Sequence, residues 1–310
     1  MIRRIFTVLL CALVLTGCAV DPIPDDRAFA FTDDTGAQIK VPGKPPKVAV
    51  LLSSLADLWV TAGGTVDITV GETVQRGITD ETVILVDDGA GKTINLEALI
   101  AAEPDFVLYS SDISGQLECA DALKAAGIPA AGFAVETFQD YLELLSICTL
   151  ILDTEEQFRV YGTDVQQEVE RMTSAARAQE NHPDVLFVRA GSSAKVTKAK
   201  TAENHFVCGM LKELGTFNIA EKAPVLLDGL STEEILMSDP DFVFFTTMGD
   251  EEAGVSYMQS LIEDPVWQNL TAVKEGRVYQ LPKELFQYKP NARWAEAYGY
   301  LIELLYGDIV

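Results

Sequence analysis

Four basic side chains stand close together in the second half of the chain, in a stretch that carries no acidic residue. Arg189, Lys195, Lys198 and Lys200 fall within residues 185–202, although the whole sequence has 47 acidic residues against 23 basic ones and a net charge of −24. Arginine and lysine bind carboxylate and catecholate oxygens through charge-assisted hydrogen bonds. A solvated basic loop would have the same composition. In so acidic a chain, however, this loop predicts a pocket wall for an anionic ligand.

The residues needed for catalysis or for a bare metal ion are missing. The chain has no Gly-x-Ser-x-Gly, no His-Glu-x-x-His and no serine, histidine and aspartate in a catalytic order. An exported hydrolase on an α/β scaffold, the main alternative from another class, therefore lacks its nucleophile. His182 and His205 are the two histidines, which excludes a three-histidine site. We expect no enzyme, no cofactor and no metal held by the protein itself.

Two motifs occur twice in the chain at nearly the same spacing. The apolar run 46–54 recurs at 183–193, an offset of 137, and the segment 96–109 recurs at 232–245, an offset of 136. Two copies, rather than many, indicate two similar lobes. The expected strands are near-continuous apolar runs at 48–52, 106–109, 185–188 and 242–245, which is typical of parallel sheets covered by helices on both faces.

One long helical pattern lies between the two copies. Thr154 and Gln157 predict a capping box, and apolar residues follow at spacings of three and four as far as residue 176. At about 1.5 Å per residue, a helix reaching residue 180 would be roughly 39 Å long, enough to brace two lobes side by side. The sequence therefore predicts an α/β fold of two similar lobes with mainly parallel sheets, joined by one long rigid helix.

The N-terminus has the order of an export signal. Arg3 and Arg4 precede an apolar run at 5–15, which is too short to span a bilayer, and Leu15-Thr16-Gly17-Cys18 follows. These last four residues resemble a lipobox, in which the cysteine thiol is acylated. Cleavage before Cys18 leaves 293 residues with 21 basic and 47 acidic side chains, a net charge of −26, which argues against nucleic acid or anionic lipid as partner. We expect an exported protein that is lipid-anchored at the outer face of the cytoplasmic membrane.

These patterns divide the chain into five parts. We expect a signal peptide at 1–17, a lipidated tether at 18–30, an N-terminal lobe at 31–153, a linking helix at 154–181 and a C-terminal lobe at 182–310. The N-terminal lobe should begin with a small hairpin that turns at 33–36. Cys119, Cys148 and Cys208 have no metal-site spacing, and a bridge between the first two stays open.

The combination resembles a known family. The sequence predicts a lipobox, two α/β lobes and one linking helix. Three further segments agree with the same family: Asn95-Leu96-Glu97 ahead of Pro104-Asp105, Leu214-Gly215 ahead of Asn218-Ile219-Ala220, and residues 273–279. Over roughly residues 31–307 the chain is similar to the iron-siderophore, haem and cobalamin class of ABC-transporter solute-binding proteins, the periplasmic binding proteins of class III.

The resemblance implies a function and its partners. It implies a monomer that captures a ferric siderophore or similar iron complex between its lobes and delivers it to the permease and ATPase subunits of an ABC importer. Haem is the second choice of ligand and cobalamin the third, because the basic loop favours anions. A sensor or adhesin lipoprotein that uses the same fold is a further alternative.

Ligands of open α/β sheets bind beyond the carboxyl ends of the strands, so the loops that follow the strands should line one cleft. Aromatic side chains there could stack on a planar ligand, and Tyr109, Tyr288 or His205 could ligate haem iron. The alternative for His205 is a packed helix residue, and for Trp294 it is core packing. The predicted ligand-binding residues are Ser53, Ser54, Leu55, Trp59, Gln75, Arg76, Asp112, Arg189, Ser192, Lys195, Lys198, Lys200, His205, Thr247, Met248, Phe286, Tyr288 and Lys289.

Two glutamates occupy equivalent positions in the two copies. Glu97 and Glu233 each stand seven residues before the proline of Pro-Asp. Asn95 and Ser231 are the expected N-caps, and Glu234 would complete a capping box with Ser231. Interaction with the helix dipole, worth about 0.3–1 kcal/mol, is the alternative role for Glu97 and Glu233. In the family that the chain resembles, one surface glutamate per lobe pairs with permease arginines, and the resemblance implies this docking role here.

Overall fold

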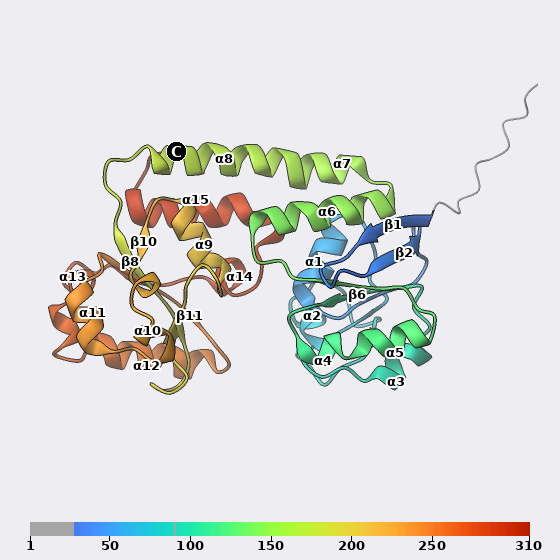
Figure 1. The fold of residues 1–310 in the computed structure, drawn as a ribbon, viewed down its shortest axis with the longest axis horizontal. Helices are drawn as coiled ribbons and strands as arrows, with labels where there is room; N and C mark the ends of the chain where they lie inside the picture. The colour runs from blue at the N-terminus through green and yellow to red at the C-terminus, as the bar shows by residue number, and fades with distance from the viewer. Residues whose placement is uncertain (1–27, 90) are drawn as a thin grey trace, which may run out of the picture.

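Two α/β lobes lie side by side, and one long helix runs along the same side of both (Figure 1). The computed structural model describes residues 28–89 and 91–310, so the predicted signal peptide and Cys18 lie outside the described residues. The main path of each sheet is parallel, with strand order β5-β4-β3-β6-β7 in the first lobe and β10-β8-β11-β12 in the second. The predicted fold class is confirmed. In the described part of the chain, no helix combines the length and the apolar character needed to cross a bilayer.

The first lobe begins with the predicted hairpin. Its strands, β1 (Ala28–Thr32) and β2 (Gln38–Pro42), pair antiparallel, and β1 begins within the segment 18–30 expected to be tether. The turn is fixed to the edge of the sheet because Asp33 Oδ2 accepts the N–H of Gly132 at 2.8 Å. The remaining elements are β3 (Val48–Val50), α1 (Ser53–Thr61), β4 (Ile68–Thr69), α2 (Gly71–Gln75), β5 (Ile84–Leu85), α3 (Leu96–Ala101), β6 (Phe106–Ser110), α4 (Ser114–Leu117), α5 (Cys119–Ala125), β7 (Ala130–Phe133) and α6 (Phe138–Leu152).

The second lobe repeats the alternation of strands and helices and adds one short antiparallel strand. This strand, β9, pairs with β8 and belongs to the basic loop. The elements are β8 (Asp184–Ala190), β9 (Lys198–Ala199), α9 (Phe206–Glu213), β10 (Phe217–Asn218), α10 (Val225–Asp228), α11 (Thr232–Ser238), β11 (Phe242–Thr247), α12 (Glu251–Ile262), α13 (Thr271–Lys274), β12 (Val278–Gln280), α14 (Lys283–Phe286) and α15 (Trp294–Tyr306), with 3-10 turns η2 (Ile219–Glu221), η3 (Trp267–Asn269) and η4 (Asn291–Arg293).

The internal repeat extends to the pairing of the strands. In the first lobe β3 lies beside β6 with Val48 opposite Phe106, and in the second β8 lies beside β11 with Val185 opposite Phe242. All four strands are almost wholly buried. Burial on both faces explains why their sequences are continuous apolar runs rather than alternating ones.

The repeat also extends to an uncommon backbone conformation. Glu103 and Asp239, each directly before the proline of a Pro-Asp pair, have φ angles of 48° and 39°. A positive φ is uncommon for residues other than glycine, yet both lobes use it at the same step. In both lobes the following aspartate then donates its N–H, at 2.8 Å, to the main chain at the start of the neighbouring strand: Asp105 to the carbonyl just before β3, and Asp241 to the first carbonyl of β8.

The linking helix is continuous but not regular. It consists of α7 (Glu155–Phe158), a π-helical turn η1 (Arg159–Thr163) and α8 (Asp164–Arg177), so it ends earlier than the predicted residue 181. Its length is roughly 35 Å at about 1.5 Å per residue. The capping box predicted at Thr154 is wrong, because the Thr154 hydroxyl donates to the carbonyl of Ala62 at 2.7 Å and makes no cap.

One hydrophobic core runs through both lobes beneath this helix, and each lobe has a further core of its own. The shared core contains the inner faces of β3, β6, β8 and β11 together with residues of α6, α8, α9 and α15. Trp294 is fully buried where the lobes meet: its ring lies 5.6 Å from that of Phe138 in the first lobe and 5.9 Å, edge-on, from that of Phe206 in the second. The core packing proposed as the alternative for Trp294 is therefore confirmed.

The three cysteines in the described residues are free and buried. The Cys119–Cys148 bridge that the sequence left open is not formed. Burial raises the pKa of the Cys148 and Cys208 thiols, so both behave as small apolar side chains in the core. Within residues 28–89 and 91–310, no group of three histidine, cysteine or acidic side chains could hold a metal ion.

Replacing Trp294 with alanine should uncouple the two lobes. We expect a loss of about 3–5 kcal/mol in the free energy of unfolding, because a large aromatic side chain leaves a cavity that the core fills only partly. Denaturant unfolding monitored by circular dichroism checks this, and a second transition would show that the lobes no longer unfold together. Leu150→Ala, at a position that is 62% exposed, is the control and should change stability by about 0.5 kcal/mol or less. Equal midpoints for the two variants would contradict the role of Trp294.

Candidate ligand-binding cleft between the lobes

The floor of the cleft is formed where β3 and β6 end. The order of the strands reverses between these two, which is where open α/β sheets bind ligands. The buried amide of Gln116 joins the main-chain segments at this point. Its Nε2 donates to the carbonyls of Leu51 and Gly91 at 2.7 Å each, and its Oε1 accepts the N–H of Ser110 at 2.8 Å. The loops that follow both strands therefore start from fixed positions.

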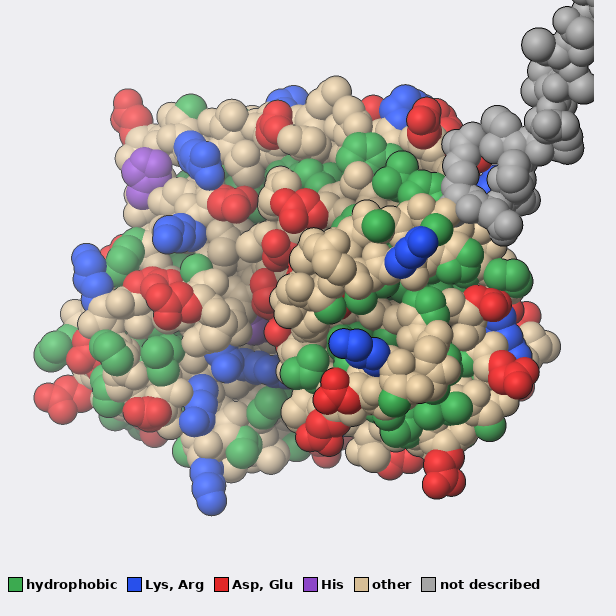
Figure 2. All heavy atoms as spheres, turned by 45° about the vertical axis from the view of Figure 1, so that its right-hand side comes forward, with side chains coloured by type: hydrophobic (Ala, Val, Ile, Leu, Met, Phe, Trp, Pro, Cys, Tyr) green, Lys and Arg blue, Asp and Glu red, His purple; other side chains and the backbone are tan. Residues whose placement is uncertain are grey.

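A cavity of about 200 Å³ lies at this floor and is lined by both lobes. The first lobe contributes Ser54, Leu55 and Asp112, and the second contributes Lys289 and Asn291. Figure 2 shows the surface hollowed between the lobes, with Lys and Arg side chains gathered beside the hollow. Four of the residues predicted from sequence to bind a ligand are thus brought together, and Asn291 joins them.

Asn291 fastens the two lobes to each other beside the cavity. Its side-chain nitrogen donates at 2.8 Å to the carbonyl of Ser54 and at 2.8 Å to Oδ2 of Asp57, both in the first lobe. Its own backbone has a φ of 49°, which is uncommon for a residue other than glycine but tolerated by asparagine. Two residues earlier, the N–H of Lys289 donates to Oγ of Ser54 at 3.4 Å. The wall of the cleft is therefore fixed by hydrogen bonds from one lobe to the other.

Arg76 also crosses between the lobes, but its charge is already occupied. Its guanidinium lies 4.1 Å from the ring centre of Tyr288 in the second lobe, a cation–π contact. It donates to Oγ of Ser53 at 2.9 Å and lies 3.9 Å from a carboxylate oxygen of Asp57. The sequence-predicted residues Ser53, Arg76 and Tyr288 do meet, and they form a bridge between the lobes.

The basic loop folds back on β8 and concentrates three cations, Arg189, Lys198 and Lys200, which we call the basic wall. Lys198 on β9 pairs directly with Arg189 on β8, so two like charges oppose each other across an antiparallel pair, an arrangement that destabilises a sheet. Burial, followed by repulsion from Arg189 and Lys198, lowers the pKa of Lys200. Within the described residues none of the three forms a salt bridge. The basic wall is therefore a site of uncompensated positive charge.

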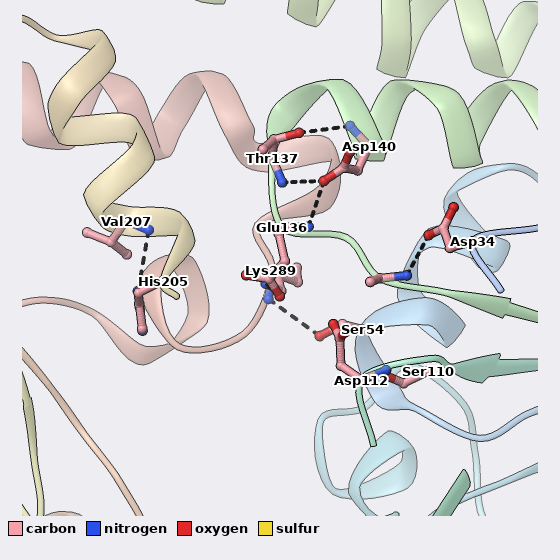
Figure 3. A network of polar contacts seen from close by, with 11 residues as sticks. Asp34, Ser54, Ser110, Asp112, Glu136, Thr137, Asp140, His205, Val207 and Lys289 are labelled. Carbon is pink, nitrogen blue, oxygen red and sulfur yellow. Dashed lines mark hydrogen bonds and ion pairs between the residues drawn. The ribbon is translucent and has the colours of Figure 1, made fainter. Parts of the chain in front are cut away.

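Two carboxylates of the first lobe, Glu136 and Asp112, lie near Lys289 of the second (Figure 3). Glu136, which precedes α6, forms a salt bridge with Lys289, with 2.7 Å between Oε1 and Nζ. Partial burial, followed by repulsion from Glu136, raises the pKa of Asp112. The cleft is thus electrostatically two-sided, with acidic side chains on the first lobe and cations on the second.

His205 serves as the N-cap of α9 rather than as a free base. Its Nδ1 accepts the N–H of Val207 at 3.4 Å (Figure 3). Its ring lies 4.5 Å from that of Phe187. Burial, followed by repulsion from Lys289, Arg189 and Lys200, lowers its pKa to about 3. A neutral histidine whose Nδ1 accepts a hydrogen bond carries its proton on Nε2. Ligation of haem iron by His205, considered from sequence, is therefore not supported by this conformation.

Several residues predicted to contact the ligand are instead buried in the lobes. Trp59 is fully buried and donates its Nε1–H to the carbonyl of Thr65 at 2.9 Å. Phe286 is fully buried against the ring of Tyr300, and Thr247 is almost fully buried at the end of β11. The expectation that these side chains face the ligand is wrong for this structure. Tyr109 is likewise buried, so it cannot ligate haem iron.

Four further residues predicted to bind the ligand are exposed. They are Gln75, Ser192, Lys195 and Met248. In the basic loop, Lys195 thus differs from half-buried Lys198 and Lys200.

The glutamates predicted to dock on a permease occupy matching places in the two lobes. Glu97 and Glu233 are exposed, and each is the second residue of its helix, α3 and α11. Asn95 caps the first helix and Ser231 the second, each through a side-chain oxygen that accepts a backbone N–H. The two helices lie toward opposite ends of the molecule (Figure 1).

Asn291 and Glu136, whose side chains link the two lobes at the cleft, were missed by the sequence analysis. Asn291 gives no signal in sequence, because its positive φ and its two acceptors come from the tertiary structure. Glu136 stands just before Thr137, whose side chain forms a capping box with Asp140 at the start of α6. The Thr-x-x-Asp pattern was a readable helix start, but it does not reveal that Glu136 meets Lys289 of the second lobe.

The geometry defines a class of protein: two α/β lobes joined through a shared core, with a charged cleft between the ends of their strands. A model of the periplasmic binding protein family matches residues 48–285, and the chain belongs to this family. Its relatives are named as binding proteins rather than as enzymes.

Individual relatives are distant but extend over most of the chain. The Fe(3+)-citrate-binding protein YfmC of Bacillus subtilis (strain 168) is 21% identical over 290 residues, which cover 89% of this chain and 87% of that protein. Staphylococcus aureus SirA, solved with staphyloferrin B, has a TM-score of 0.70 at 18% identity and covers 89% and 98% of the two chains. The periplasmic heme-binding protein RhuT from Roseiflexus sp. RS-1, in apo form, has a TM-score of 0.69 at 18% identity, covering 84% and 97%.

The burial of His205 predicts a dependence of stability on pH. Its folded pKa of about 3 lies below the unfolded value of 6.5, so between these values the unfolded chain binds a proton that the folded chain does not. Stability is therefore fully present above about pH 6.5 and is lost as the pH falls toward 3. His205→Asn keeps an N-cap but removes the titration. Its free energy of unfolding relative to wild type should rise by up to about 1.4 kcal/mol per pH unit on acidification from pH 6 to 4.

Denaturant unfolding at a series of pH values measures this difference, in which the titrations common to both proteins cancel. His182→Asn, at an exposed position, is the matched control for the loss of one histidine. A His205→Asn curve that runs parallel to wild type would show that His205 titrates normally in the folded protein.

Proposed function

We propose that this chain is the solute-binding component of an ABC importer and captures a ferric siderophore or a similar anionic iron complex between its lobes. The observation that carries the proposal is the basic wall, three cations without a salt bridge among the described residues of an acidic chain. Uncompensated cations that repel one another are costly to keep, and a bound anion would relieve that repulsion. Relatives named for Fe(3+)-citrate and for staphyloferrin B fit this chemistry.

Haem is the second candidate, since RhuT is named as a heme-binding protein and haem also carries carboxylates. The conformation of His205 favours a siderophore over haem, because its Nδ1 is used as a helix cap. Cobalamin ranks third, because it offers the basic wall less negative charge. The proposal also includes the lipid anchor at Cys18, which would hold a monomeric binding protein at the outer face of the cytoplasmic membrane.

Titration of the purified protein with ferric citrate, ferric staphyloferrin B, haemin and cobalamin tests the ligand class. We expect an anionic ferric complex to bind tightest. Binding of cobalamin alone would overturn the proposal.

Removing charge from the basic wall should weaken the bound complex. For Lys198→Gln combined with Lys200→Gln, we expect a loss of about 1.5–3 kcal/mol for each lysine that hydrogen-bonds the anion. The dependence of the dissociation constant on salt should also flatten, because salt screens the attraction between these lysines and the anion. Isothermal titration calorimetry at several salt concentrations measures both. Lys195→Gln removes the same charge from the same loop at an exposed position and should have little effect. Equal losses for Lys195→Gln and the double variant would indicate a general effect of net charge.

The equivalent glutamates Glu97 and Glu233 support a docking surface that involves both lobes. We expect Glu97→Ala and Glu233→Ala to leave ligand affinity unchanged and to lower uptake and stimulated ATPase activity in proteoliposomes that contain the transporter, the double variant most. Each substitution should cost only about 0.3–1 kcal/mol of helix-dipole stabilisation, so folding should be retained. Glu252→Ala is the matched control, because Glu252 is also exposed and also the second residue of its helix, α12. Full transport by the double variant would leave both glutamates with a dipole role alone.

A further inference from the structure

One salt bridge joins the two lobes across the cleft. Among the ion pairs of the described residues, those other than Glu136–Lys289 lie within one lobe or along the linking helix. Glu136 belongs to the segment between β7 and α6, and Lys289 to the segment between α14 and η4. The Lys289 side chain is 20% exposed and that of Glu136 is 50% exposed, so the lysine is the better enclosed partner. The pair borders the cavity at the cleft floor, and both residues line it.

The main chains of both partners are fixed, while their charged ends are held only by weak contacts. The N–H of Lys289 donates to Ser54, and the ammonium lies 4.6 Å from the ring centre of Phe206. The N–H of Glu136 donates to Oδ2 of Asp140 at 2.9 Å, in the capping box of α6 (Figure 3). If the carboxylate of Glu136 turned away from Lys289, it would remain at the positive N-terminal end of a fifteen-residue helix. The ammonium of Lys289 would keep its cation–π contact with the ring of Phe206.

The pair stands at the border between the two charged sides of the cleft. Repulsion from Lys289, Arg189 and Lys200 lowers the pKa of His205, so the positive charge of Lys289 adds to that of the basic wall. On the first lobe, repulsion from the carboxylate of Glu136 contributes to the raised pKa of Asp112. An anion that enters the cleft toward the basic wall would therefore meet an ammonium whose partner is a carboxylate of the protein.

We propose that Glu136 is a specificity-determining residue that competes with the ligand for Lys289. Its carboxylate occupies the place of a ligand oxygen, and an anionic ligand displaces it. The inference rests on the proposed function and adds to it a requirement: the ligand carries an anionic oxygen at the end that reaches Lys289. A half-exposed ion pair is weak, so a carboxylate or catecholate oxygen replaces it readily, whereas a neutral ligand cannot compensate the ammonium.

Calorimetric titration with ferric citrate, or with haemin if ferric citrate does not bind to wild type, tests the competition. The variants are Glu136→Gln, Lys289→Gln and the two combined. Glu136→Gln should tighten binding by about two- to fivefold, the equivalent of one exposed ion pair. Lys289→Gln should weaken it by about tenfold or more. In the Lys289→Gln background, Glu136→Gln should change the dissociation constant by less than about twofold, because the competition requires the lysine. Glu143→Gln, at an exposed position on α6, is the control of equal charge.

Each result decides the inference. Unchanged affinity for Glu136→Gln, with the effect of Lys198→Gln and Lys200→Gln intact, would overturn the competition and leave the proposed function standing. Tightening of similar size with and without Lys289 would show long-range repulsion instead, and would also overturn it. If neither wild type nor Glu136→Gln binds ferric citrate or haemin, the inference and the proposed function are overturned together. Binding by Glu136→Gln alone would support the competition directly.

Discussion

The junction of the two lobes is the constraint on which the cleft depends. The core is continuous from the sheet of one lobe to that of the other, and Trp294 packs between Phe138 and Phe206 at its centre. The hydrogen bonds of Asn291 to the first lobe fasten the junction on the side that faces the cavity. Because apolar burial and hydrogen bonds act at the same place, the loops that line the cleft are positioned before any ligand arrives. Such preorganisation reduces the entropy lost on binding.

Electrostatics give this fixed cleft its chemical character. The protein as a whole is strongly acidic, which would repel an anion at long range, so capture has to rely on short-range contacts inside the cleft. The basic loop after β8 provides them by pairing Lys198 with Arg189, at a cost in sheet stability. The acidic side chains of the first lobe limit how far the positive field extends. If the proposed anion binds here, the two sides together would favour a ligand whose negative charge is concentrated at one end.

The sequence was sufficient for the architecture because the architecture follows from local patterns. Apolar runs, Pro-Asp breaks and two matching offsets defined the strands and the two lobes, and the structure extends the match to the φ angles of Glu103 and Asp239. The basic loop could also be identified from the sequence, because the charge of a segment follows from its composition alone. The composition of a loop does not show which of its large side chains are buried. Trp59 and Phe286 follow strands, as cleft residues do, but both turn into the core that the two lobes share.

Contacts between distant segments account for most of the remaining differences. Thr154 was a plausible N-cap in sequence. In the structure its hydroxyl donates instead to the carbonyl of Ala62, which is 92 residues away in the chain. Glu136 acquired its role only through Lys289, which is 153 residues away. Pairings of this kind depend on how the lobes are joined, and no periodicity in either segment records them.

The continuous core has a consequence for how a transporter would meet this protein. Lobes that share one core have little freedom for a large hinge motion, so we expect the spacing of α3 and α11 to be nearly the same with and without ligand. If docking uses these two helices, empty and loaded molecules present almost the same surface, and the transporter binds both. Empty protein then acts as a competitive inhibitor of its own delivery cycle. The rate of uptake would depend on the loaded fraction, and overproduction without ligand would slow transport rather than speed it.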